Sequence, residues 1–311
     1  MKPDDALFNS EFLAKLEQLY LLSRRIFRGR SHGERRSREI GSSLEFADYR
    51  NYTPGDDPRS IDWNIYGRLE RLFIKLYEDE EDLPVYLLLD VSASMRWEPE
   101  TSRLYGEKTS QKKKHSLNKL DYTRRVAACL AYIALENLDH VDICYFDSRL
   151  GQSTGAGKGF FPKALAFLRT LPAEAGATNL LSAIDDFVRK RPRRGLAILL
   201  SDFLDPQHCE AALGLLHAGK FEVQLLHVLH PYELSPGLHG DFQLEDAETG
   251  KTLEANLNEG LIQAYRQRLG AYLESIEQFT RRRGMGYLRT DTSIPFEDFV
   301  LKTLRKQNIL R

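Results

Sequence analysis

Two hydrophobic patterns alternate along the chain from residue 83 onward. Unbroken apolar runs at 83–89 and 195–201 are typical of strands that are buried on both faces of a sheet. Between them, segments such as 117–138 and 180–190 repeat apolar residues at helical spacing. Further strands are expected at 141–146, 222–229 and 286–289, and further helices at 161–171, 206–218, 261–282 and 296–306. This alternation predicts a doubly wound, mostly parallel α/β sheet of the Rossmann-like kind.

Three segments are expected to be additions to this sheet. Residues 1–30 carry a helical pattern between Leu7 and Phe27 and predict an N-terminal helix. Residues 31–82 predict a small β-rich subdomain, and residues 83–311 hold the main domain. Within the main domain, two alternating stretches flank a Glu-Thr-Gly-Lys turn and predict an inserted β-hairpin near 241–256.

The first apolar run ends in Asp90, which is followed by Ser92 and Ser94. In an open α/β sheet, ligands bind at the carboxyl ends of the strands, and these oxygen atoms are donors that Mg²⁺ prefers. One loop cannot enclose the ion, so partners are needed; Thr178 precedes a predicted helix and Asp202 ends the second apolar strand. Capping of the following turn by Asp90 and the serines is the alternative interpretation.

The spacing Asp-x-Ser-x-Ser, then a Thr, then an Asp resembles the metal-ion-dependent adhesion site of von Willebrand factor A domains. All five positions are filled, by Asp90, Ser92, Ser94, Thr178 and Asp202. The resemblance implies a von Willebrand A-like fold and a bound Mg²⁺ or Mn²⁺. It also implies an open coordination position that accepts an acidic side chain of a partner protein.

A second resemblance covers most of residues 33–230. The run Tyr52-Thr-Pro-Gly-Asp-Asp-Pro-Arg-Ser-Ile-Asp-Trp63 resembles the hallmark of the domain of unknown function 58 (DUF58) family. The similarity continues through Arg68, Leu69, Lys75, Glu80, Lys119-Leu-Asp121-Tyr122 and Ser201-Asp202-Phe203. Members of that family are often encoded beside MoxR-type AAA+ ATPases, so the resemblance implies such an ATPase as a partner.

The aspartates of this hallmark allow two interpretations. Asp56, Asp57 and Asp62 could form a second cation site, or Asp56 and Asp57 could cap the short turn that follows while arginines pair with them. Capping is favoured, because aspartates are common in turns. Trp63 is expected to be a core anchor of this segment.

Composition restricts the remaining function classes. The 311 residues include 44 Lys and Arg against 45 Asp and Glu, a formal net charge of −1, so no global basic field directs the protein to nucleic acid. An arginine-rich stretch at 24–38 is expected to be solvated, and so is the acidic run 78–82. The polar segment 96–116 predicts a mobile loop near the metal edge.

Targeting signals, hydrophobic runs and cysteines indicate the expected location of the protein. The start of the chain has no signal-peptide layout, and no run approaches the length of a membrane span, so a cytoplasmic protein without an integral membrane segment is expected. Cys129, Cys144 and Cys209 are scattered and predict reduced thiols. The glycine-rich stretch 151–159 departs from phosphate-loop spacing and predicts a flexible loop.

The pattern therefore favours a metal-dependent binding module, an adaptor or scaffold, over an enzyme. The alternative is a Mg²⁺-assisted hydrolase of phosphoesters. Aspartate-based phosphatases need a second carboxylate two residues after the first, and Ser92 occupies that position here. No Ser, His and Asp set forms an evident triad, so no catalytic residue is predicted.

Overall fold

A computed structural model describes residues 7–28, 40–78, 84–97, 117–136, 140–155, 161–172, 178–191, 193–205 and 209–307. The chain divides into two compact units, residues 1–29 with 83–311 and residues 30–82, which we describe separately. The predictions for the arginine-rich stretch, for the acidic run and for most of the 96–116 loop concern residues or side chains outside the described part of the chain.

A six-stranded sheet in the order β10-β7-β6-β3-β4-β5 is the centre of the first unit. Its strands are β3 (Val85–Asp90), β4 (Val141–Phe146), β5 (Leu150–Ser153), β6 (Leu196–Ser201), β7 (Glu222–Leu229) and β10 (Gly286–Asp291). All neighbours pair in parallel except β5, which pairs antiparallel with β4. The predicted mixed α/β fold with a mostly parallel sheet is confirmed, and β3 lies between β6 and β4.

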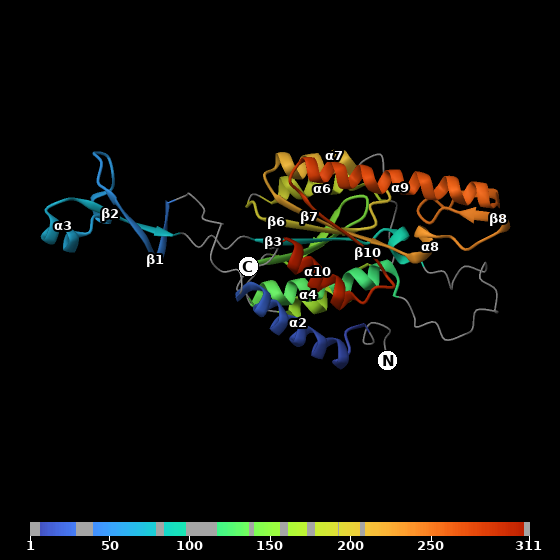
Figure 1. Ribbon diagram of the computed structural model, residues 1–311, viewed down its shortest axis with the longest axis horizontal. Helices are drawn as coiled ribbons and strands as arrows, with labels where there is room; N and C mark the ends of the chain where they lie inside the picture. Colours follow the sequence, from blue (N-terminus) through green and yellow to red (C-terminus); the bar gives the residue numbers. More distant parts are fainter. Residues whose placement is uncertain are drawn as a thin grey trace. The chain divides into compact units, whose positions relative to one another are not determined.

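Helices cover both faces of this sheet (Figure 1). The larger ones are α2 (Ser10–Arg28), α4 (Lys119–Glu136), α5 (Phe161–Arg169), α6 (Leu180–Lys190), α7 (Cys209–Ala218), α9 (Glu259–Arg282) and α10 (Phe296–Gln307). Leu87 and Leu89 of β3 pack with α2, α4, α5 and α10, while Tyr86 and Leu88 pack with α6, α7 and α9. Alternate side chains of one strand thus enter two cores, which explains the unbroken apolar run in the sequence.

Strand β5 departs from the flexible loop predicted at 151–159. Residues 151–153 are ordered as an edge strand that pairs with β4. A Cβ atom at Gly151 would lie 2.1 Å from the ring of Tyr145, so only glycine allows this close approach. The glycine is required by packing, and its presence was misinterpreted as a sign of flexibility.

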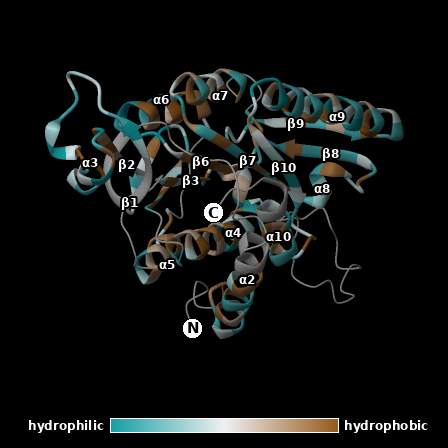
Figure 2. Ribbon diagram, turned by 60° about the vertical axis from the view of Figure 1, so that its left-hand side comes forward, coloured by the Kyte–Doolittle hydropathy of each residue, from teal (hydrophilic) through white to brown (hydrophobic). Residues whose placement is uncertain are grey.

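The predicted hairpin is present as β8 (Gly240–Glu245) and β9 (Thr252–Leu257), which pair antiparallel. It follows a short helix, α8 (Pro231–Leu234), and precedes α9. Figure 2 shows hydrophobic and hydrophilic positions alternating along α9, as expected for a helix with one buried face. The hairpin and the first turns of α9 extend beyond the strands of the central sheet (Figure 1).

The second unit contains β1 (Ile40–Asn51) and β2 (Phe73–Glu78), which pair antiparallel, and two short helices, η1 (Pro58–Ser60) and α3 (Trp63–Leu69). Helix α3 was missed, because the whole of residues 31–82 was predicted to be a β-rich subdomain and the helix is only seven residues long. The prediction of Trp63 as a core anchor is wrong: its side chain is 63% exposed and touches Tyr66 edge-on.

Two further observations concern the described residues as a whole. None of the helices in the described ranges has the length and apolar character needed to cross a membrane. Cys129, Cys144 and Cys209 are free and buried, in α4, β4 and the start of α7. Burial raises the pKa of the Cys144 thiol to about 12, so this thiol is protonated at neutral pH.

Candidate functional site

The loop after β3 folds around the carboxylate of Asp90. One oxygen accepts the backbone N–H of Ser92 at 2.9 Å, and the other accepts the hydroxyl of Ser201, the last residue of β6, at 2.6 Å. The hydroxyl oxygens of Ser92 and Ser94 lie 3.1 Å apart. Asp90 and Ser92 are buried and Ser94 is half-buried, so the loop presents its hydroxyls at the rim of the sheet.

Asp202 follows β6, the strand beside β3, and its carboxylate is also buried. One oxygen accepts the backbone N–H of Leu204 at 3.1 Å, and the other accepts the ammonium of Lys119 at 2.6 Å. Lys119 is the first residue of α4, is fully buried and also donates to Glu233 of α8. The prediction that β3 and β6 bring their terminal aspartates to one edge agrees with this geometry.

The pKa values of Asp90 and Asp202 are shifted in opposite directions. Burial, and then the neighbouring charge of Asp202, raise the pKa of Asp90 to about 7. Burial also acts to raise the pKa of Asp202, but the Lys119 ammonium outweighs it and holds that pKa below its ordinary value, helped by the Leu204 N–H and the Ser94 hydroxyl. The cluster holds three carboxyl groups, those of Asp90, Asp202 and Glu233, and one ammonium, so it carries excess negative potential that a cation can offset.

Thr178 lies on the loop that leads into α6. The next residue, Asn179, donates its backbone N–H to the carbonyl of Asp147, just after β4, and the N–H of Leu180 donates to Asp205, just after β6. Because β3 lies between β4 and β6, this loop crosses the end of β3, where Asp90 is. Thr178 therefore belongs to the same edge of the sheet.

The hydroxyl of Thr178 is bound by an acidic side chain from the hairpin. Glu248, in the turn between β8 and β9, accepts the Thr178 hydroxyl at 2.8 Å and its backbone N–H at 3.0 Å. The side chain of Asp246 shapes this turn by accepting the N–H groups of Glu248 and Thr249. A fixed turn thus holds a carboxylate against the predicted ligand Thr178.

The structure brings Asp90, Ser92, Ser94 and Asp202 together, and it places Thr178 on the same edge, in contact with Glu248. Sequence reasoning missed the roles of Lys119 and Glu233 in this cluster, and that of Glu248. Lys119 opens the Lys-Leu-Asp-Tyr motif, which was the one available signal. Within the described residues, no group of three His, Cys, Asp or Glu side chains has the geometry to hold a metal ion, and this includes the three carboxyl groups of the cluster. A cation here would therefore also need the hydroxyl oxygens.

The donor set fits such a cation in its chemistry. Two hydroxyls and a carboxylate occur on one loop, a third hydroxyl lies on the neighbouring loop, and all are hard oxygen ligands suited to Mg²⁺ or Mn²⁺. Burial and the charge of Asp202 raise the pKa of Asp90 and so disfavour its ionised form. A divalent cation bound at this loop would favour the ionised form.

The aspartates of the second unit behave as caps. Asp57 accepts the N–H of Arg59 at the start of η1, and Asp62 accepts the N–H of Asn64 at the start of α3, both at 2.9 Å. Asp56 pairs with Arg50 at 2.9 Å. The favoured interpretation is thus confirmed in part: Asp57 caps the turn that follows and Asp56 pairs with an arginine, but Asp56 accepts the N–H and hydroxyl of Thr53 before it instead of capping that turn.

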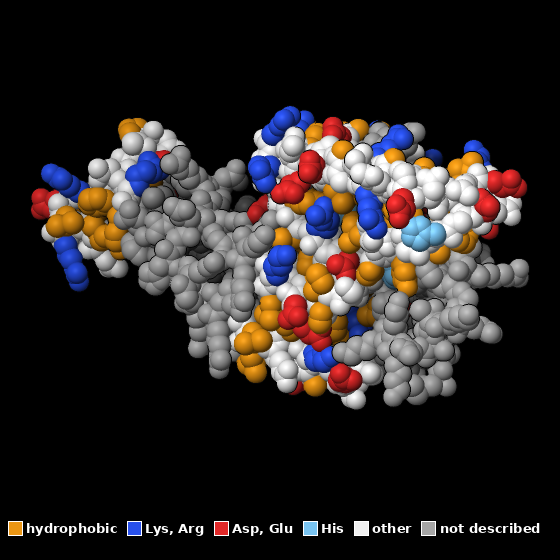
Figure 3. Space-filling view, turned by 45° about the vertical axis from the view of Figure 1, so that its right-hand side comes forward, with side chains coloured by type: hydrophobic (Ala, Val, Ile, Leu, Met, Phe, Trp, Pro, Cys, Tyr) orange, Lys and Arg blue, Asp and Glu red, His pale blue; other side chains and the backbone are white. Residues whose placement is uncertain are grey.

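One face of the first unit shows how charges are distributed over the described residues. On the displayed face of the first unit, Figure 3 shows acidic and basic side chains interspersed rather than gathered by sign. This distribution is consistent with the balanced charge of the sequence.

Comparisons with known proteins give relatives along most of the chain. An uncharacterised protein of Mycobacterium bovis is 26% identical over 284 residues, which cover 89% of this chain and 84% of that protein. An uncharacterised protein of Mycobacterium avium is 35% identical over 115 residues, which cover 36% of this chain and 68% of that protein.

Solved structures resemble the chain more distantly. A conserved hypothetical protein, BatB from Bacteroides thetaiotaomicron, is 16% identical with a TM-score of 0.40, covering 72% of this chain and 98% of that one. An aerotolerance-related membrane protein from Bacteroides fragilis is 15% identical with a TM-score of 0.40, covering 72% of this chain and all of that one, 100%. Likenesses at this level carry no argument about the present chain.

The family comparison is the most extensive. A family described as "Protein of unknown function DUF58" matches residues 48–274, a range that includes the capped turn of the second unit, the Asp90 cluster and the hairpin. Because this match spans most of the chain, the protein belongs to the DUF58 family.

Proposed function

We propose that the protein is a non-catalytic binding module that captures an acidic side chain of a partner protein through a divalent cation. Mg²⁺ or Mn²⁺ would be held by Asp90, Ser92, Ser94 and Thr178, with Asp202 acting through water. This ligand set does not saturate the ion, so the bound metal offers an electrophilic position to a carboxylate oxygen. The proposed site corresponds to the metal-ion-dependent adhesion site of von Willebrand A-like domains.

One observation carries the proposal: the buried carboxyl groups of Asp90 and Asp202 lie beside the hydroxyls of Ser92 and Ser94 at one edge of a parallel sheet. The alternative role for Asp90 was local capping, and its bond to the Ser92 N–H is of that kind. Capping alone does not require a second buried carboxylate from another strand. Lys119 already pairs with Asp202, and a cation would add the partner that the buried Asp90 carboxyl group needs when it is ionised.

The Glu248 contact supports the acidic nature of the ligand. Thr178 donates both its hydroxyl and its N–H to this carboxylate, so the edge already binds an acidic side chain of the chain itself. An acidic side chain of a partner is the same chemistry presented from outside. Glu248 also occupies the hydroxyl that the metal would use, so the two compete for Thr178.

The resemblance to families encoded beside MoxR-type AAA+ ATPases supplies the partner in this proposal. An adaptor role for such an ATPase needs no catalytic residue in this chain. Because an ATPase requires ATP, we place the encounter in the cytoplasm.

Metal-linked melting tests the proposal. Mg²⁺ or Mn²⁺ is titrated into wild type, Asp90→Ala and Ser92→Ala, with Asp57→Ala as a control in which a capping aspartate of the second unit is removed. Wild type and Asp57→Ala should gain stability with metal, about 2.7 kcal/mol at a hundredfold excess over Kd, and the two site variants should lose most of this gain. An equal gain in all four proteins would contradict the site.

A phosphoesterase assay of the same four proteins distinguishes a binding module from an enzyme. A Mg²⁺-assisted hydrolase should turn over a generic phosphoester such as p-nitrophenyl phosphate and lose that turnover in Asp90→Ala. The binding module should show no turnover in any of them. Metal-dependent turnover that disappears with Asp90 would replace the binding proposal by the hydrolase.

A further inference from the structure

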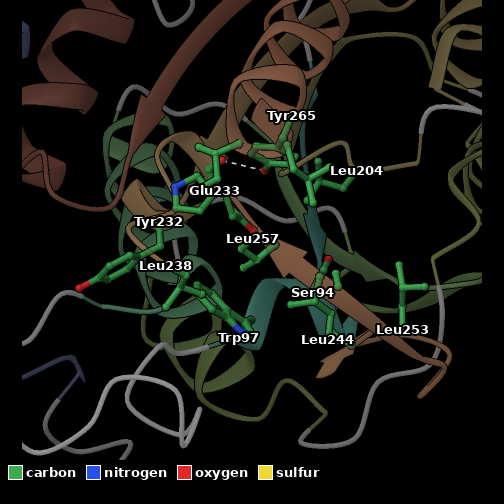
Figure 4. A pocket seen from close by; sticks show the side chains of 15 residues that line it. Ser94, Trp97, Leu204, Tyr232, Glu233, Leu238, Leu244, Leu253, Leu257 and Tyr265 are labelled. Atoms are coloured by element: carbon green, nitrogen blue, oxygen red, sulfur yellow. Dashed lines mark hydrogen bonds between the residues drawn. The ribbon is translucent and has the colours of Figure 1, made fainter. Parts of the chain in front are cut away.

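An apolar pocket opens beside the candidate metal site. Its volume is about 520 Å³, within the range of pockets that bind small molecules or side chains of partners. The hairpin, the start of α9, α8 and the loop after β3 all contribute to its wall. Figure 4 shows side chains from these elements converging on the hollow, with Ser94 and Trp97 on one side and Tyr265 and Leu204 on another.

Large apolar side chains stay exposed around this pocket. Leu253 is 66% exposed, Leu261 45%, Tyr265 41% and Leu204 40%, and all four line the hollow. An exposed leucine on its own needs no explanation, but a cluster of them around a concavity marks an interaction surface.

The pocket is apolar and also lacks a free charge. Glu233 is the acidic residue of its lining, and its carboxylate is held by Lys119. The hydroxyl of Tyr265 donates to the backbone carbonyl of Glu233 at 2.7 Å, the bond drawn in Figure 4. Lys and Arg are absent from the described lining, so a phosphate or another anionic group finds no counter-charge there. The lining therefore favours an uncharged, apolar side chain or ligand in the pocket.

Two contacts connect the pocket with the acid-binding edge. Ser94 belongs both to the pocket wall and to the predicted metal ligands. In the hairpin turn, Ala247 lines the pocket while the next residue, Glu248, reaches Thr178. Neighbouring Cα atoms are about 3.8 Å apart, and here two neighbouring residues of the chain reach the pocket and Thr178. Two neighbouring residues of a bound peptide could therefore also reach the pocket and the acid-binding edge.

We infer that the pocket receives a bulky apolar side chain from the same partner segment whose acidic side chain is captured at the sheet edge. The recognised motif is an Asp or Glu within one or two positions of a Leu, Ile, Met or Phe. The inference rests on the proposed metal-dependent capture of an acidic side chain and adds the second half of the motif. The acid gives metal dependence, and the apolar side chain adds affinity by removing exposed leucines from water.

Peptide selection tests the motif without knowledge of the natural partner. Random linear peptides displayed on phage are bound to the full-length protein in Mg²⁺ and eluted with acid, so that metal-dependent and metal-independent binders are both recovered. The enriched sequences should combine an acidic residue with a neighbouring bulky apolar residue. Synthetic copies are then titrated against wild type and variants.

The chain offers matched variants for this titration. Leu253→Ser and Leu261→Ser remove exposed apolar side chains of the pocket and should each weaken peptide binding about tenfold. Leu21→Ser is the control, because Leu21 of α2 is 60% exposed but does not line the pocket. Equal melting temperatures of the three variants and wild type would show that folding is intact.

The outcomes distinguish the inference from the function on which it rests. Metal-dependent acidic peptides without an apolar preference, bound equally by Leu253→Ser, overturn the pocket inference and leave metal-dependent capture standing. Apolar peptides without acidic residues, bound equally in EDTA, overturn metal-dependent capture and with it the combined motif. Self-association of wild type that Leu253→Ser abolishes, measured by sedimentation, would assign the pocket to a second copy of the chain and also overturn the inference.

Discussion

The turn after β3 and the turn before α3 both place aspartates beside hydroxyl groups, with a basic side chain nearby, yet their carboxylates titrate in opposite directions. Burial and the charge of Asp202 raise the pKa of Asp90 to about 7. In the second unit, the hydrogen bond from Arg50, followed by those from Thr53, lowers the pKa of Asp56. The two turns share a residue type and differ in what surrounds it.

The difference lies in where the partners come from. Asp56 is satisfied by Arg50 and Thr53, which are within six residues of it in the sequence, so its turn is complete by itself. The partners of the Asp90 cluster come from β6 and α4, and one ammonium faces three carboxyl groups. A turn that contains an aspartate thus becomes a candidate ligand site when tertiary structure buries the carboxyl group and surrounds it with more carboxyl groups than basic ones.

Removing the basic partner from each turn should give the largest contrast. Lys119→Ala leaves Asp202 and Glu233 buried without their ammonium, and we expect a loss of about 3–5 kcal/mol in the free energy of unfolding. Arg50→Ala removes the partner of a partly exposed carboxylate that Thr53 also binds, and it should have a far smaller effect. Urea unfolding of both variants measures the contrast, and equal losses would remove the distinction between the two turns.

The pH dependence of stability, measured with a chelator present, should have opposite signs for Asp90 and Asp56. A raised folded-state pKa means that the unfolded chain loses the Asp90 proton first, so Asp90 makes the protein less stable as pH rises from about 4 to about 7. Asp90→Asn removes this loss, and its stability relative to wild type should increase by roughly 2–4 kcal/mol across that window.

Asp56→Asn is the matched control for this pH series. The pKa of Asp56 is lowered, so its contribution is present above about pH 4 and disappears as the pH falls through the folded-state value. Asp56→Asn should therefore be less stable than wild type at neutral pH, and the difference in the free energy of unfolding should disappear at acidic pH. Unfolding curves at several pH values test both, and parallel trends for the two variants would contradict the opposite shifts.

Sequence patterns predicted the elements that depend on local periodicity and strand ends. Helix α6 and strands β4 and β7 were predicted with their observed bounds, and Asp90 and Asp202 were placed at one edge because the ends of both apolar runs are visible. The capping role of Asp57 was also accessible, since a cap acts on the next few residues.

Contacts between distant segments were not accessible in the same way. Lys119 begins an amphipathic helix, where a lysine ordinarily lies in solvent, and its burial depends on where α4 meets β6 and α8. Glu248 and Thr178 are 70 residues apart, and nothing local pairs them. The prediction for Trp63 was wrong because it rested on the residue type alone. Aromatic character predicted burial, but the short helix α3 leaves the ring exposed.

The smallest expected effect belongs to Asp62, the most buried aspartate of the second unit's turn. Its carboxylate accepts the N–H groups of Asn64 and Ile65 at the start of α3, a role that asparagine fills equally well. Asp62→Ala should cost about 1 kcal/mol and Asp62→Asn only a few tenths, with or without Mg²⁺. Unfolding with and without the metal measures both variants. If Asp62→Asn abolished a Mg²⁺-dependent gain in stability, the carboxylate would be a ligand, and the contrast between a closed cap and an open site would not hold.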